Sequence, residues 1–117
     1  MLLISGHATE ALAQFEREPE EGSRLVGRAL ANHAMGLKTE ADSALARLGE
    51  TYADRRAYSV ARVHAYRGEL DQAFAWLDRA YLQRDINCVE VKRDVLLRNL
   101  IPDPRFAAYL RKMRLPE

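Results

Sequence analysis

The sequence has a single cysteine, Cys88, and no long apolar run. One cysteine cannot form an internal disulfide framework or a thiolate cluster for zinc. The longest apolar runs, such as Met1–Ile4 and Val95–Leu97, are far shorter than the roughly 20 residues that cross a bilayer. Gly6 and His7 interrupt any signal-peptide core. We therefore expect a cytoplasmic protein that does not contact a membrane.

Proline and glycine are also scarce, with four and six among 117 residues. Together with 48% hydrophobic and 30% charged residues, this is typical of a globular chain rich in helix formers. The length fits one compact domain. No segment alternates apolar and polar residues over a strand's length, so we assign no strands.

Motifs that carry chemistry are missing as well. There is no GxSxG nucleophile turn and no glycine-rich phosphate loop of the GxxxxGK[ST] or GxGxxG form. The histidines and Cys88 have no partner at the short spacings of structural zinc sites; His33 and His64 are better explained as packed or groove-lining imidazoles. We expect no catalytic residue, no metal site and no cofactor.

Nucleic-acid binding needs a basic face with aromatic platforms. The candidates are Arg105, Arg111, Lys112 and Arg114 with Phe106 and Tyr109. Because the aromatics share core spacing with Leu110 and Met113, we expect them to be buried. We therefore do not expect nucleic acid as a partner.

What the chain does have is a repeat. Glycine is followed five residues later by alanine, and four residues after that by a large apolar residue, three times: Gly6–Ala11–Phe15, Gly36–Ala41–Leu45 and Gly68–Ala73–Leu77. The intervals, 36 − 6 = 30 and 68 − 36 = 32, are slightly shorter than the 34-residue tetratricopeptide unit. A period of this length predicts stacked helix pairs.

Helix boundaries follow from amphipathic spacing and from capping residues. Pro19 suits a first turn, Thr39 with Asp42 resembles a capping pair, and Asp54 can cap the next helix. Gly36 and Gly68 suit the left-handed residue that ends a helix. The predicted helices are near 8–17, 20–35, 39–51, 55–67 and 69–83.

The C-terminal segment 92–117 predicts a separate cap on the repeat region, 1–91. Asp103 followed by Pro104 is typical of an N-cap with proline in the first turn, so we expect a helix near 104–113. Phe106, Tyr109, Leu110 and Met113 should cover the helix at 69–83, because terminal repeats need a covering layer to stay soluble.

Two segments carry a family resemblance: Arg28 to Gly36 (RALANHAMG) and Val63 to Ala80 (VHAYRGELDQAFAWLDRA). They resemble tetratricopeptide repeats. The ending, from Leu97 through Asp103-Pro-Arg-Phe106, resembles the C-terminal tail of bacterial multidomain members that carry a nucleotide cyclase, protein kinase or winged-helix domain. The resemblance implies an all-α fold, a right-handed superhelix of antiparallel helix pairs with a C-terminal cap.

The resemblance also implies a peptide-binding groove along the first helix of each pair. Carried over residue by residue, the groove positions are Val26, Leu30, His33, Arg55, Tyr58, Arg62 and Tyr66. Tyrosine and arginine are common in binding hot spots. The Lys and Asn pattern that clamps a peptide carboxylate is absent, since Val26 and Leu30 stand there.

Charge and apolar residues at the two ends predict self-association. Residues 1–22 hold five acids against one base, and residues 92–117 hold seven bases against three acids. We expect a twofold homodimer through an apolar patch of Leu2, Leu3, Ile4, Leu12 and Phe15. A head-to-tail contact between the acidic start and the basic end is the alternative.

The resemblance implies a non-catalytic module that binds or scaffolds other proteins, within a larger bacterial signalling or regulatory protein whose partner the sequence does not identify. The alternative is an accessory region of an enzyme polypeptide, such as an adenylate or guanylate cyclase, that supports its catalytic domain.

Overall fold

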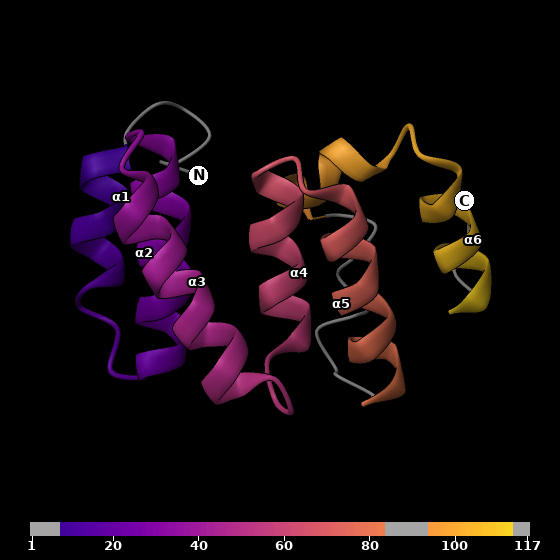
Figure 1. Cartoon of the computed structure of the whole chain (residues 1–117), viewed down its shortest axis with the longest axis horizontal. Coiled ribbons are helices and arrows are strands. Elements are labelled where there is room, and N and C mark those ends of the chain that lie inside the picture. The colour runs from indigo at the N-terminus through magenta and orange to yellow at the C-terminus, as the bar shows by residue number, and fades with distance from the viewer. Residues whose placement is uncertain (1–7, 84–93, 114–117) are drawn as a thin grey trace. The chain divides into compact units, whose positions relative to one another are not determined.

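A computed structural model describes residues 8–83 and 94–113, and every regular element in this part of the chain is a helix (Figure 1). The elements are α1 (Ala8–Phe15), α2 (Glu21–Ala34), α3 (Lys38–Tyr52), α4 (Ala57–Tyr66), α5 (Leu70–Leu82), the 3₁₀ helix η2 (Val95–Leu100) and α6 (Pro104–Lys112). The all-α class is confirmed for the described residues.

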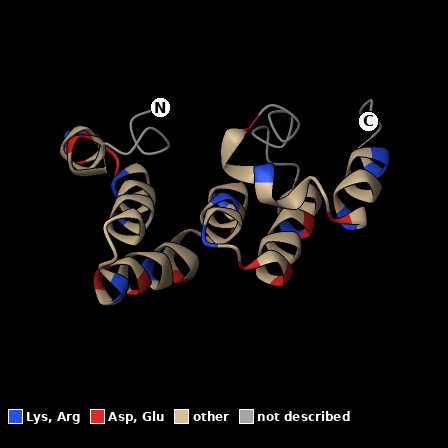
Figure 2. Cartoon of the chain, turned by 90° about the horizontal axis from the view of Figure 1, so that it is seen from above, with Lys and Arg blue, Asp and Glu red and all other residues tan. Residues whose placement is uncertain are grey.

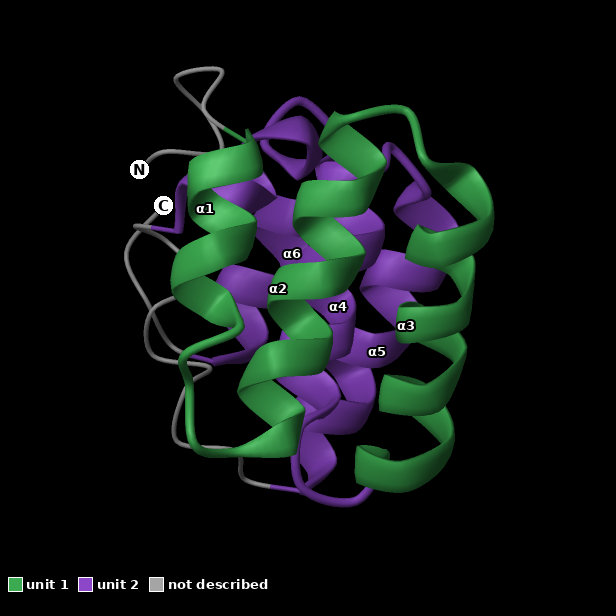
Figure 3. Ribbon diagram, turned by 90° about the vertical axis from the view of Figure 1, so that its left-hand side faces the viewer, with its two compact units in different colours: residues 1–53 green, residues 54–117 purple. Residues whose placement is uncertain are grey.

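The chain forms two compact units, coloured separately in Figure 3. Unit 1 spans Met1–Ala53 and unit 2 spans Asp54–Glu117. The C-terminal segment lies in the same unit as α4 and α5, where η2 packs on α4 and α6 packs on α5.

In unit 1, α2 and α3 form a helix pair joined by a tight turn at Gly36. The Gly36 N–H donates to the His33 carbonyl at 3.0 Å, and the Leu37 N–H donates to the Asn32 carbonyl at 2.8 Å. Gly36 has φ of 78°, a conformation that side chains with a Cβ disfavour. This is the Schellman ending that the sequence predicts for this glycine.

Unit 2 repeats the same turn at Gly68, which has φ of 80°. Gly68 donates to Ala65 at 3.1 Å and Glu69 donates to His64 at 2.9 Å, the same two bonds one interval of 68 − 36 = 32 residues later. The helices keep this interval: α2 and α4 end at Ala34 and Tyr66, and α3 and α5 begin at Lys38 and Leu70. The two hairpins are local copies of each other.

The first helix of unit 1, α1, packs on α2 through an aromatic ring and an ion pair. Phe15 lies so close to Gly27 that a Cβ built on that glycine would overlap the Cβ and Cγ atoms of Phe15. Beside this contact, Arg28 holds Glu16 with two bonds of 2.6 and 2.9 Å. Gly27 is therefore used for close helix packing, a reason that the sequence pattern did not indicate.

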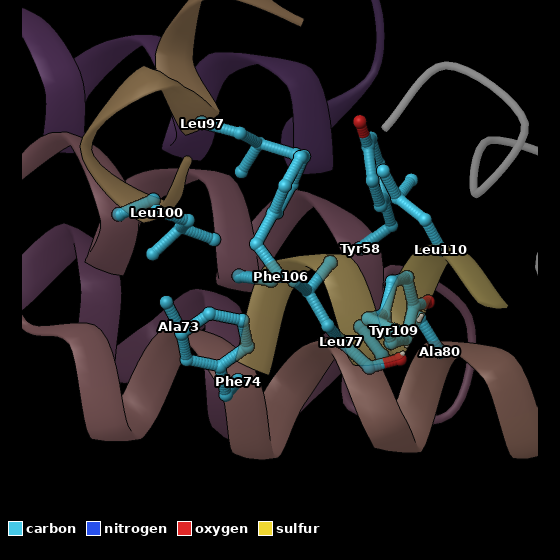
Figure 4. Packing of buried hydrophobic residues seen from close by; sticks show 13 residues of the cluster. Tyr58, Ala73, Phe74, Leu77, Ala80, Leu97, Leu100, Phe106, Tyr109 and Leu110 are labelled. Carbon is cyan, nitrogen blue, oxygen red and sulfur yellow. Dashed lines mark hydrogen bonds between the residues drawn. The ribbon is translucent and has the colours of Figure 1, made fainter. Parts of the chain in front are cut away.

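Unit 2 has a continuous hydrophobic core to which α4, α5, η2 and α6 all contribute (Figure 4). Phe106, Tyr109 and Leu110 of α6 are buried in it, with Met113 packed at its edge. The Tyr109 hydroxyl donates to the Leu77 carbonyl at 3.0 Å. The expected helix of the cap is thus present and covers α5.

The ends of α6 also follow the sequence. Asp103 is the N-cap and accepts a hydrogen bond from the Arg105 N–H at 2.9 Å, and Pro104 occupies the first turn. Both features satisfy or remove amide donors that a helix start leaves unpaired.

Three other expected caps are wrong. Leu37, not Thr39, precedes α3, and no side chain caps that helix. Asp54 does not cap α4, which begins at Ala57 after Arg56; Asp54 instead pairs with Arg79 at 3.3 Å. Pro19 lies before the N-cap of α2, Glu20, because the chain needs the extra residues to turn from α1. For α3, the tight turn at Gly36 places Leu37 directly before the helix.

Candidate functional site

The expected groove places three residues on α4 at successive turns: Tyr58, Arg62 and Tyr66. The structure puts Tyr58 in the core of unit 2, with 3% of its surface exposed. Arg62 and Tyr66 are half-buried, and Arg55 is exposed just before α4. The expected position of Tyr58 on an open groove face is therefore corrected.

The reason is a buried carboxylate, Asp94, which the sequence analysis did not single out. Its Oδ2 accepts a hydrogen bond from the Tyr58 hydroxyl at 2.9 Å and lies 2.6 Å from Nε of Arg62. Its Oδ1 accepts the Leu96 N–H at 3.0 Å, which makes Asp94 the N-cap of η2. With 7% of its side chain exposed, Asp94 is bonded on both oxygens and has little access to a ligand.

A second polar link holds the other end of η2. Asn99 Nδ2 donates to the Ala65 carbonyl at 2.9 Å, and Leu97 and Leu100 are buried in the core. Part of the α4 face that was expected to meet a partner's peptide thus meets the chain's own residues 94–100. The signal in the sequence was an aspartate immediately before an apolar run, Val95–Leu97, which is the pattern of a capped helix start.

The remaining groove residues lie on α2, in unit 1. Val26 and Leu30 are buried, with 7% and 1% exposed, and His33 is half-buried. The structure therefore brings Tyr58 and Arg62 together on Asp94, and it gives Val26 and Leu30 the environment of core residues.

Of the expected dimer patch, Leu2, Leu3 and Ile4 lie outside the described residues. Leu12 and Phe15 are half-buried on α1. Because the ring of Phe15 packs on Gly27 of the same unit, the apolar surface that α1 offers is smaller than the sequence suggested.

The ionisable side chains beside the Gly68 turn are paired with one another. His64 Nδ1 lies 2.9 Å from Glu69 Oε1, and Arg67 Nε lies 3.0 Å from the same oxygen. All three surround the Gly68 turn. Among residues 8–83 and 94–113 no group of three His, Cys, Asp or Glu side chains could hold a metal ion; Cys88 is outside these ranges.

The side of α6 that adjoins α5 is electrostatically matched to it. Arg105 pairs with Asp71 at 2.9 Å and Lys112 pairs with Asp78 at 3.3 Å. Arg105 also lies over the Phe74 ring at 4.5 Å, and Lys112 over the Tyr81 ring at 4.7 Å. Hydrogen bonds from the Arg105 side chain and backbone lower the pKa of Asp103. These bases are therefore used within unit 2.

Three contacts that η2 and α6 make with α4 and α5 join residues at the same separation in the sequence. Asp71 and Arg105, Asp78 and Lys112, and Ala65 and Asn99 are each 34 residues apart. Since Asp71 and Asp78 meet Arg105 and Lys112 in the same order, α6 runs parallel to α5. The segment from η2 to α6 thus follows α4 and α5 as a further, irregular helix pair.

None of the described helices is both long and apolar enough to cross a membrane. Comparisons with protein-family models, with curated proteins and with solved structures gave no match.

Proposed function

We propose that the chain is a non-catalytic module for protein–protein association, built from degenerate repeats of the tetratricopeptide type. The observation that carries the proposal is the recurrence of one helix pair. The Gly36 and Gly68 turns have the same two hydrogen bonds and the same φ, and a third pair follows at a separation of 34 residues. Stacked helix pairs typically present extended surfaces for protein partners.

The polar groups of the described residues support this proposal over a chemical role. The best-formed buried polar cluster, Tyr58 with Arg62 and Asp94, fixes η2 on α4. The ion pairs of α6 fix that helix on α5. Several large apolar side chains are exposed, namely Leu37, Tyr81, Leu82, Val95 and Ile101, and these positions can report contact with a partner.

Site-specific photo-crosslinking in cells tests the proposal. A photoreactive phenylalanine analogue would replace Leu37, Leu82 or Ile101 in turn in the full chain, with the exposed Ser43 on α3 as the matched control. We expect at least one aliphatic position to give a discrete adduct with a polypeptide, identified by mass spectrometry, and Ser43 to give none.

The absence of any discrete adduct at all three aliphatic positions would contradict the proposal. Adducts of equal yield at Ser43 would also contradict it, because they would indicate collision rather than a defined surface.

A further inference from the structure

One face of η2 is exposed and carries an unusual combination of side chains. In a 3₁₀ helix, residues three apart lie above one another, and the Ile101 N–H continues the helical bonding by donating to the Arg98 carbonyl at 3.3 Å. Val95, Arg98 and Ile101 therefore share one face, which we call the η2 strip. Val95 and Ile101 are 52% and 60% exposed, and Arg98 is exposed between them.

Leu97 and Leu100, on the other side of η2, are in the core, so the strip faces away from the described part of that core. A pair of exposed aliphatic side chains on either side of a cation favours a partner that combines apolar surface with negative charge.

The two units differ in the sign of their net charge; Figure 2 marks the charged residues of the described part of the chain. Unit 1 has eight acidic and five basic side chains, which gives 5 − 8 = −3, and unit 2 has nine acidic and thirteen basic ones, which gives 13 − 9 = +4. Opposite net charges of this size attract separate molecules at low ionic strength.

Unit 1 also offers the matching local surface, on α1 and the loop after it. Leu12 and the part of Phe15 that Gly27 does not cover are half-buried, and the exposed Glu18 follows them along the chain. We call these three residues the α1 surface. Arg24 bonds to the carbonyl of Glu18 at 2.7 Å and not to its carboxylate. The α1 surface combines apolar side chains with a carboxylate, as the η2 strip combines an apolar pair with a guanidinium.

We propose that the η2 strip of one copy docks on the α1 surface of a second copy. This inference rests on the proposed function, because it names one partner for the module. The contact joins different surfaces, so it is heterologous: copies associate head to tail, and the assembly grows with concentration unless a ring closes. The surfaces are small and charged, so the contact is weak and sensitive to salt.

Sedimentation velocity of the full chain tests the proposal, from about 1 μM to about 1 mM and at ionic strengths of about 0.05 M and about 0.5 M. We expect the average mass to rise with concentration, and the higher salt to weaken association by roughly tenfold. Ile101→Ser should weaken association by at least about tenfold. Leu82→Ser, which alters a 77% exposed leucine of the same unit, should leave it unchanged.

Charge reversal identifies the two sides of the contact. Arg98→Glu and Glu18→Arg should each weaken association alone, and an equimolar mixture of the two variants should recover it. Trp76 fluorescence melts check that unit 2 is folded in Arg98→Glu, and circular dichroism melts check that unit 1 is folded in Glu18→Arg.

Three results would overturn the proposal. The first is a monomer under all conditions, and the second is association that Ile101→Ser and Arg98→Glu leave unchanged, as in a twofold dimer through α1 alone. The third is failure of the mixture to recover association. None of these removes the proposed function, which the crosslinking experiment tests separately through its yield at the aliphatic positions and at Ser43.

Discussion

The two hairpins have the same turn but are held in place by different chemistry. In unit 1, α1 packs on α2 through Phe15 and Gly27 and through an exposed ion pair, Glu16 with Arg28. In unit 2, η2 packs on α4 through a buried carboxylate. Val26 occupies the position 58 − 32 = 26 that corresponds to Tyr58. One repeat pattern thus accommodates a buried valine at this position in unit 1 and a buried, hydrogen-bonded tyrosine in unit 2.

The largest expected effect on stability comes from a substitution in the core of unit 2. Phe106→Ala should lower the free energy of unfolding of unit 2 by about 3–5 kcal/mol, because the ring is 6% exposed within the core. Trp76 is the only tryptophan and packs against this core, so denaturant melts followed by its fluorescence report on unit 2. Leu82→Ala, at an exposed site, should cost less than about 0.5 kcal/mol. Equal small losses would show that α6 does not dock.

The next effect tests the buried polar link between Tyr58 and Asp94 in unit 2. Tyr58→Phe removes a donor from a buried carboxylate and should cost about 1.5–3 kcal/mol, whereas Tyr109→Phe removes a bond to a neutral carbonyl and should cost about 1 kcal/mol. Both variants keep the ring, so the comparison isolates the hydroxyl. A loss for Tyr58→Phe no larger than that for Tyr109→Phe would contradict the role given to Asp94.

Features set by residues that are close in the sequence could be predicted, whereas contacts between distant residues could not. The helices, the left-handed Gly36 and Gly68, and the capped start of α6 were predicted well, because each depends on spacing or on a local cap. The burial of Tyr58 was missed, since it depends on Asp94, 36 residues later. Asp54 was assigned as a cap for a similar reason: its partner, Arg79, is 25 residues away.

Substitution of the glycine in each turn tests whether the two hairpins are equivalent, because the two losses of stability should be alike. Gly36→Ala and Gly68→Ala should each cost about 1–2 kcal/mol, because a Cβ is disfavoured at positive φ. No atom lies within 4 Å of either added Cβ, so the cost comes from the backbone alone. Asparagine at the same positions should cost less, since it tolerates this conformation better. Costs that differ several-fold between the two glycines in a global denaturant melt would break the equivalence.

The smallest effect concerns acid. A hydrogen bond from Arg28 lowers the pKa of Glu16 in unit 1, and hydrogen bonds from Arg105 lower the pKa of Asp103 in unit 2. A lowered pKa in the folded state means that the stabilisation is present above the unfolded pKa and is lost as the pH falls through the folded pKa. Both units should therefore lose a little stability on acidification. Carboxyl NMR titrations measure the two pKa values. Arg28→Gln should raise the pKa of Glu16 and leave that of Asp103 unchanged.

We conclude that residues 94–113 belong to the folded core of unit 2, and that residues 94–100 among them cover part of the α4 face expected for a peptide. Amide hydrogen exchange on the full chain tests it most directly, because protection reports the free energy of local opening. We expect the amides of Leu97, Leu100 and Leu110 to exchange as slowly as those of Ala73 and Leu77 of α5. Fast exchange of these three amides, with α5 still protected, would contradict the claim, since it would show that η2 and α6 leave α4 open.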